Sequence, residues 1–293
     1  MSNIQTSAFV KKLAANGMST STRHLLTHGR RILTSPSDRP TRTAALASLK
    51  KFLSRPVELP LLENEKLWKG LFYSMWFCDR PRPQQRLAAD LGELYLSIPS
   101  QNFSKFCLAF WIVMAREWMA IDHHRLDKFL LLVRRVVFFQ LKRLREEEWN
   151  ETLLQGFVEA LKKCPLSGDA KVSTGIPFHL IDIYADELER MMFEEIQEDE
   201  EDEEDEEKRS EIVDRTPLDE LIQPFVTLSK EALLKTLREK IKTDLLADER
   251  LKKWGIVEEE SKKTFTESGD EEDEGEDEDD EESDSEEEWN GFA

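Results

Sequence analysis

Apolar residues recur at intervals of three and four along most of the chain, and this spacing restricts the fold more than any other feature of the sequence. In residues 64–79, Leu67, Leu71, Met75 and Cys78 fall on one face of a helix. Such spacing indicates amphipathic helices, whereas a half-buried strand would need strict alternation, which is nearly missing here. The sequence therefore predicts an all-α fold.

Prolines divide this pattern into separate helices. Because proline lacks an amide hydrogen and clashes with the preceding turn, Pro56, Pro81, Pro83 and Pro99 mark helix boundaries. Residues 103–120 are apolar on nearly every side, which predicts a central buried helix. Short connections favour antiparallel helix pairs stacked into an irregular helical-repeat (α-solenoid-like) bundle. Because no fixed repeat period is visible, an irregular bundle without such stacking remains the alternative.

Charge divides the chain into parts. Residues 1–193 contain 28 Lys and Arg against 20 Asp and Glu, whereas residues 194–293 contain 13 against 41, which gives the net charge of −20. This asymmetry favours nucleic acid or basic proteins as partners. We predict the following parts: a helical body (1–193) with a disordered insertion (17–37), an acidic linker (194–210), amphipathic helices that dock on the body or on a partner (211–257), and a disordered acidic tail (258–293).

The sequence gives little support for catalysis. It contains no Gly-rich phosphate loop and no Cys-x-x-Cys pair, and its three cysteines lie in apolar surroundings that suit reduced core thiols. His24 and His28 have the spacing of a zinc-binding helix, but the Glu of a zinc protease is replaced by Leu25. His179, Asp182 and Asp186 lie on one face of an expected helix and could bind a metal or transfer protons, but capping and surface hydrogen bonds explain them better. We predict no catalytic residue, no metal, no cofactor and no small-molecule substrate.

The longest apolar window, residues 106–115, is bounded by charged residues. A membrane span takes about 20 apolar residues, so we expect no membrane partner. The N-terminus has no apolar run after its basic residues, so we expect no signal peptide. These features predict a soluble intracellular protein.

Basic residues on one expected long helix are the strongest candidates for contact with RNA or with a larger particle. They are Arg134, Arg135, Lys142, Arg143 and Arg145. Interleaved with apolar residues, they could form a ridge that contacts phosphates of structured RNA. The alternative is an ordinary solvated helix face, partly neutralised by the acidic residues 146–148.

The acidic tracts also have two interpretations. They could be solubilising segments without a specific partner, or they could mimic nucleic acid and hold basic proteins. Ser283 and Ser285 each precede an acidic residue by three positions, a pattern that acidophilic kinases prefer, so we predict phosphorylation at both.

Several segments in order resemble the eukaryotic nucleolar family of ribosomal RNA-processing protein 1. They are residues 9–14 (FVKKLA), 68–76 (WKGLFYSMW), 79–81 (DRP), 116–118 (REW), 125–129 (RLDKF), 177–188 (PFHLIDIYADEL) and 221–226 (LIQPFV). One departure is the polar segment 17–37, which interrupts the family pattern as a species-specific loop or as translated intron sequence.

The resemblance implies a non-catalytic factor of the nucleus and nucleolus that is required for pre-rRNA processing. It implies work chiefly in assembly of the large ribosomal subunit, as a helical scaffold on the precursor particle, with pre-rRNA and assembly-factor or ribosomal proteins as partners. From the acidic tracts alone, a chaperone for basic nuclear proteins such as histones or ribosomal proteins is the alternative.

Overall fold

The computed structural model describes residues 39–196 and 203–256, and every regular element in these two ranges is a helix. The all-α prediction is therefore confirmed for this part of the chain. Three sequence predictions lie outside the described residues: the insertion at 17–37 with His24 and His28, the tail at 258–293, and its candidate phosphorylation sites Ser283 and Ser285.

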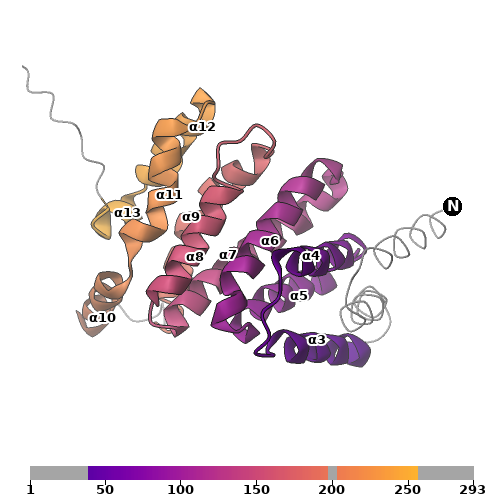
Figure 1. Cartoon of the computed structure of the whole chain (residues 1–293). Coiled ribbons are helices and arrows are strands. Elements are labelled where there is room, and N and C mark those ends of the chain that lie inside the picture. The colour runs from indigo at the N-terminus through magenta and orange to yellow at the C-terminus, as the bar shows by residue number, and fades with distance from the viewer. Residues whose placement is uncertain (1–38, 197–202, 257–293) are drawn as a thin grey trace, which may run out of the picture. The chain divides into compact units, whose positions relative to one another are not determined.

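The helices follow one another along the chain with short connections. Their bounds are α3 (Arg39–Leu53), α4 (Leu61–Trp76), α5 (Pro81–Gly92), η1 (Glu93–Ser97), α6 (Ser100–Glu117), η2 (Trp118–Ala120), α7 (His123–Glu146), α8 (Glu151–Lys163), α9 (Gly175–Met192), α10 (Glu203–Arg215), α11 (Leu218–Glu231), α12 (Lys235–Lys240), η3 (Ile241–Leu246) and α13 (Glu249–Lys253). Here η1 and η2 are 3₁₀-helices and η3 is a π-helix. Figure 1 shows the purple helices α3–α5 on one side of α6–α9 and the orange helices α11–α13 on the other.

The helices are arranged in two rows. In the first row α4 packs on α6, α6 on α8, and α8 on α11. In the second row α5 packs on α7, α7 on α9, and α9 on α12 and η3. Helices α4 to α7 each contact the next but one along the chain, as expected for stacked helix pairs, and α8 and α9 each contact the third helix along because α10 intervenes. This confirms the solenoid-like arrangement.

Prolines set several helix boundaries, as the sequence predicts. Pro81 is the first residue of α5 and Pro99 directly precedes α6, whereas Pro83 lies within the first turn of α5. Pro60, which is not among the predicted boundaries, directly precedes α4. A proline in these positions forfeits no intrahelical hydrogen bond. Asn150 begins α8 in another way, because its side chain accepts a hydrogen bond from the amide of Leu153 at 3.3 Å.

The core lies between the two rows and is rich in aromatic rings. Trp68 of α4 packs against Phe106 and Phe110 of α6, with ring centroids 4.9 Å and 4.8 Å apart. Its indole nitrogen donates a hydrogen bond to the carbonyl of Phe106 at 3.2 Å, so the buried polar atom is satisfied.

All three cysteines of the chain are buried, and none of them forms a disulfide. Cys78 follows α4, Cys107 lies in α6, and Cys164 follows α8. Burial raises the pKa of the Cys164 thiol to about 12 and also raises the pKa of Cys107. These two thiols therefore stay protonated at neutral pH, as their apolar surroundings predict.

The acidic segment differs from the expected linker. Residues 203–210 form the first half of α10 instead of an extended chain. Ion pairs one helical turn apart offset part of the like-charge repulsion: Lys208 lies 3.3 Å from Asp205, and Arg215 lies 3.4 Å from Glu211.

The segment after α10 packs on the body. In α11, Leu221 and Phe225 are buried. The hydroxyl of Tyr184 in α9 donates to the carbonyl of Leu221 at 3.0 Å, and its ring lies 4.6 Å from that of Phe225. Residues 39–196 and 203–256 all belong to one compact unit.

Candidate nucleic-acid interface

The five basic residues predicted to form a ridge all lie on α7, but they do not share one face. Arg134, Lys142 and Arg145 are turned toward α9 and the residues that follow it. Arg143 has its hydrogen-bond partners elsewhere, at Glu147 and at the carbonyl of Ile98. Helical geometry explains the division: Arg134 and Arg143 are nine residues apart, so they point to nearly opposite sides of α7.

Arg134 forms the most buried ion pairs of this group. It pairs with Asp186 at 2.9 Å and with Glu187, whose side chain is 0% exposed. Arg190 also contacts Glu187, at 3.2 Å. Partial burial works against the charged form of Arg134, but the two carboxylates outweigh it and raise the pKa of the guanidinium. This cluster joins α7 to α9.

Lys142 and Arg145 hold the chain just beyond α9. Both pair with Glu194, at 2.9 Å and 3.0 Å, and Arg145 also lies 3.5 Å from Glu195. Although desolvation opposes it, Lys142 and Arg145 keep the pKa of Glu194 below its usual value. The first residues of the predicted linker are thus anchored on α7.

Arg143 and Arg135 complete the predicted set. Arg143 lies 2.8 Å from Glu147, one turn along the same helix. Arg135 is half-buried, and burial together with the nearby charge of Arg190 lowers its pKa. RNA contact at these five residues remains a prediction; at four of them, a phosphate would compete with a carboxylate that is already bound.

A different group of cations has no such partner. Arg80, Arg82 and Arg86 are exposed at the start of α5, and in the described part of the chain no carboxylate lies within ion-pair distance of them. Sequence reasoning used this segment only as a helix boundary and as part of the family pattern. Its signal was three arginines within seven residues, with only Asp79 beside them.

The turn that carries these arginines is held from several sides. The ammonium group of Lys128 in α7 donates to the carbonyls of Trp76 and Cys78 at 2.7 Å and 2.9 Å. The side-chain amide of Gln84 also donates to the carbonyl of Cys78, at 2.8 Å. Lys128 is itself buried, and desolvation lowers its pKa. The end of α4, the start of α5 and the start of α7 therefore meet at one place.

Three half-buried aromatic residues lie next to this turn. They are Tyr73, Trp76 and Phe77, at the end of α4. The ring centroid of Tyr73 is 6.1 Å from that of Trp76 and 6.4 Å from that of Phe77. The guanidinium of Arg125 lies 4.9 Å from the centroid of the Trp76 ring, a cation–π contact.

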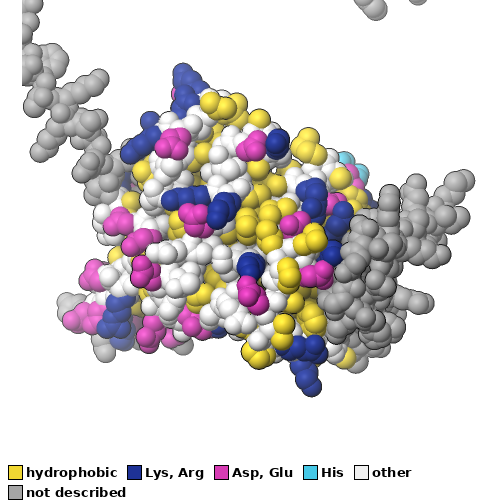
Figure 2. All heavy atoms as spheres, in the orientation of Figure 1, with side chains coloured by type: hydrophobic (Ala, Val, Ile, Leu, Met, Phe, Trp, Pro, Cys, Tyr) yellow, Lys and Arg dark blue, Asp and Glu magenta, His cyan; other side chains and the backbone are white. Residues whose placement is uncertain are grey.

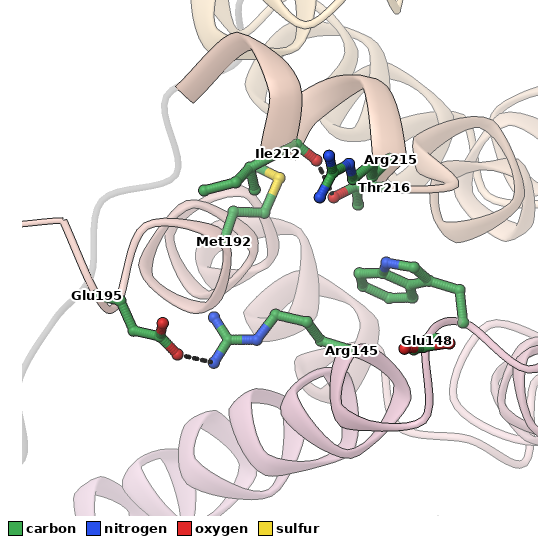
Figure 3. A pocket seen from close by; sticks show the side chains of 8 residues that line it. Arg145, Glu148, Met192, Glu195, Ile212, Arg215 and Thr216 are labelled. Atoms are coloured by element: carbon green, nitrogen blue, oxygen red, sulfur yellow. Dashed lines mark hydrogen bonds and ion pairs between the residues drawn. The ribbon is translucent and has the colours of Figure 1, made fainter. Parts of the chain in front are cut away.

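A pocket of about 550 Å³ lies where the ends of α7 and α9 meet α10. Met192 and Ile212 give it an apolar lining, and Arg145 and Arg215 add charge; Figure 3 shows Arg145 directed toward Glu195 at one side. The hydroxyl of Thr216 is engaged, since it donates to the carbonyl of Ile212 at 2.7 Å. The lining offers surface for binding and no pair of nucleophile and base.

The α7–α8 turn at the rim of this pocket has an uncommon backbone. Glu148 and Trp149 have φ values of 51° and 58°. Both residues line the pocket. The left-handed region costs residues with a Cβ about 1–2 kcal/mol each.

His179 does not form a site with its acidic neighbours. Its Nε2 atom lies 3.0 Å from the carbonyl oxygen of Leu130, and burial lowers its pKa. Asp182 instead pairs with Lys240 at 2.6 Å. Within residues 39–196 and 203–256, no group of three His, Cys, Asp or Glu side chains is placed to hold a metal ion. No helix in these ranges is both long and apolar enough to cross a bilayer.

The face of the molecule in Figure 2 carries cationic and anionic side chains close together, with apolar side chains between them. Charges of opposite sign are neighbours at several places on this face.

Comparison with known proteins places this architecture in a family. A family model described as "Nucleolar protein,Nop52" matches residues 29–292. Over 169 residues the chain is 33% identical to the human protein named Ribosomal RNA processing protein 1 homolog B. This alignment covers 56% of this chain and 22% of the human protein.

Two further relatives come from other animals. The mouse protein named Ribosomal RNA processing protein 1 homolog A is 32% identical over 169 residues, covering 56% of this chain and 34% of that protein. The Drosophila melanogaster protein named Ribosomal RNA processing protein 1 homolog is 34% identical over 127 residues, covering 43% and 18%. The alignments therefore span about a third of these relatives' length or less.

Proposed function

Because this chain belongs to the Nop52 family of nucleolar proteins, we propose that it is a non-catalytic scaffold for pre-rRNA processing in the nucleolus. It acts chiefly in assembly of the large ribosomal subunit, where its stacked helices dock on the precursor particle. The names of its relatives place them in ribosomal RNA processing, which supports the coarser role in ribosome biogenesis.

The observation that carries this proposal is the extent of the family match, which includes the whole described stack of helices. Stacked helix pairs present long surfaces suited to large partners. Within the described residues, Glu187, Asp186 and Glu194 form ion pairs between elements, so these carboxylates serve to hold the stack together.

Depletion and rescue test the proposal. Cells depleted of the protein should accumulate precursors of large-subunit rRNA, and the full chain should co-sediment with precursor particles and restore processing. Unchanged precursors, or a chain found only in the free fractions of the gradient, would contradict the proposal. Incubating the purified chain with RNA and a divalent metal should give no cleavage; cleavage would contradict the non-catalytic role.

A chaperone for basic nuclear proteins is the second candidate, since the acidic residues of the chain gather in its last third. Deleting residues 270–288 separates the two functions. Loss of histone or ribosomal-protein binding, together with loss of particle association, would favour the chaperone. Retained particle association would favour docking through the helical body.

A further inference from the structure

We propose that the α4–α5 turn binds a single-stranded segment of RNA, a surface that deepens the proposed function and rests on it. Arg80, Arg82 and Arg86 would contact the phosphates, and the aromatic residues Tyr73 and Trp76 beside them would stack on unpaired bases. We call this surface the turn patch, defined by these five residues.

The charge of the turn patch is free to act on a ligand. An arginine that already binds a carboxylate must release it before it can bind phosphate, as Arg134 would have to release Asp186 and Glu187. Arg80, Arg82 and Arg86 have no carboxylate to release among the described residues. Each phosphate contact that they make would therefore release counterions from the RNA at no such cost.

The turn patch is also held in place before a ligand arrives. Pro81 and Pro83 restrict the backbone at the start of α5, and Lys128 fixes the carbonyls of Trp76 and Cys78 from α7. Arg82 and Arg86 are four residues apart, so they lie on the same side of α5. A preorganised surface loses less conformational entropy on binding.

The aromatic residues favour RNA with unpaired bases over an acidic peptide or a duplex. Bases in a single strand can stack on exposed rings and on guanidinium planes, whereas paired bases are hidden from such contacts. Trp76 and Tyr73 are half-buried near the end of α4, four and seven residues before Arg80 along the chain. A purely acidic partner would need the arginines but would gain little from the rings.

The test uses the full chain and a fluorescein-labelled 12-residue oligouridylate, with affinity measured by anisotropy at several salt concentrations. The triple variant R80Q/R82Q/R86Q should bind at least about tenfold more weakly. The slope of log K against log salt concentration should also be shallower by about 2, because each lost phosphate contact removes ~0.7 from the slope. R80K/R82K/R86K keeps the charge and should retain most of the salt dependence.

A matched control removes the same charge elsewhere. Lys242, Lys252 and Lys253 are exposed on η3 and α13 and have no carboxylate partner in the described part of the chain. The variant K242Q/K252Q/K253Q should bind the oligonucleotide as the wild type does. Circular dichroism should show the same helical content for all variants.

Several results would overturn the proposal. The proposal fails if the wild type does not bind the oligouridylate, or if both triple Gln variants lose affinity equally. It also fails if R80Q/R82Q/R86Q binds with the affinity of the wild type. Competition by polyglutamate as strong as by oligouridylate would indicate an acidic protein partner instead. Tighter binding to a hairpin duplex than to the single strand would overturn the role of the aromatic residues.

The rescue experiment separates this inference from the proposed function. If depletion alters rRNA processing and R80Q/R82Q/R86Q rescues it fully without RNA binding, the scaffold role stands and the turn patch is not its RNA contact. If depletion leaves processing intact, the proposed function fails, while the anisotropy measurement still decides whether the turn patch binds RNA.

Discussion

Single residues in the α7–α8 turn hold backbone strain that substitution can release. Glu148 has a φ of 51°, in the left-handed region that glycine adopts at little cost. We expect Glu148→Gly to raise the free energy of unfolding by about 1 kcal/mol. Glu147, with a φ of −95°, is the matched position, and Glu147→Gly should lower stability by about 1 kcal/mol because it also removes the pair with Arg143. Urea unfolding of the two variants checks the difference in sign.

The buried imidazole of His179 makes stability depend on pH. Because burial lowers its pKa in the folded protein, the unfolded state binds a proton more readily below about pH 6.5. Stability from this group is therefore present at neutral pH and falls as the pH drops through that value. His179→Gln should lose less stability than the wild type between about pH 7.5 and pH 5.5, as measured by urea unfolding. Equal losses would mean that His179 does not titrate differently in the two states.

At the scale of elements, the ion pairs between α7 and α9 should contribute measurably to stability. Arg134→Ala leaves the buried carboxylate of Glu187 with Arg190 alone, so we expect a loss of roughly 2–3 kcal/mol. The control is Arg215→Ala, which breaks an exposed pair with Glu211 and should cost about 0–1 kcal/mol. Similar effects of the two substitutions on the urea midpoint would contradict a structural role for Arg134.

The same elements mark how far sequence reasoning could go. Helical spacing and prolines predicted most of the helices, because both act within a few residues along the chain. The partners of Arg134 and Lys142 lie 52 residues away, on α9 and just beyond its end, and no local pattern specifies them. For the same reason the sequence could not separate a paired arginine such as Arg134 from an unpaired one such as Arg82. Like charge in residues 203–210 argued against a helix, but short-range ion pairs and packing of Ile212 against the core outweighed it.

For the whole molecule, the stacked arrangement predicts that the last helices protect the ones before them. Removing residues 217–293 would uncover the faces of α8 and α9 that α11 and η3 cover, including the ring of Tyr184. We expect this chain to unfold at a lower temperature and to aggregate in sedimentation experiments. A chain that ends at Ile256 keeps α11–α13 and serves as the control, with a melting temperature close to that of the full chain. Equal melting temperatures for both truncations would contradict the dependence.

The three buried thiols have a consequence for measuring how the stack opens. One follows α4, one lies within α6 and one follows α8, so successive helix pairs each contain a single cysteine. A buried thiol reacts with an alkylating reagent only while its surroundings are open. Each of the three alkylation rates of the unmodified protein therefore reports how often the helix pair around that cysteine opens. If they differ, they give the order in which the pairs come apart; if they agree, the pairs open together.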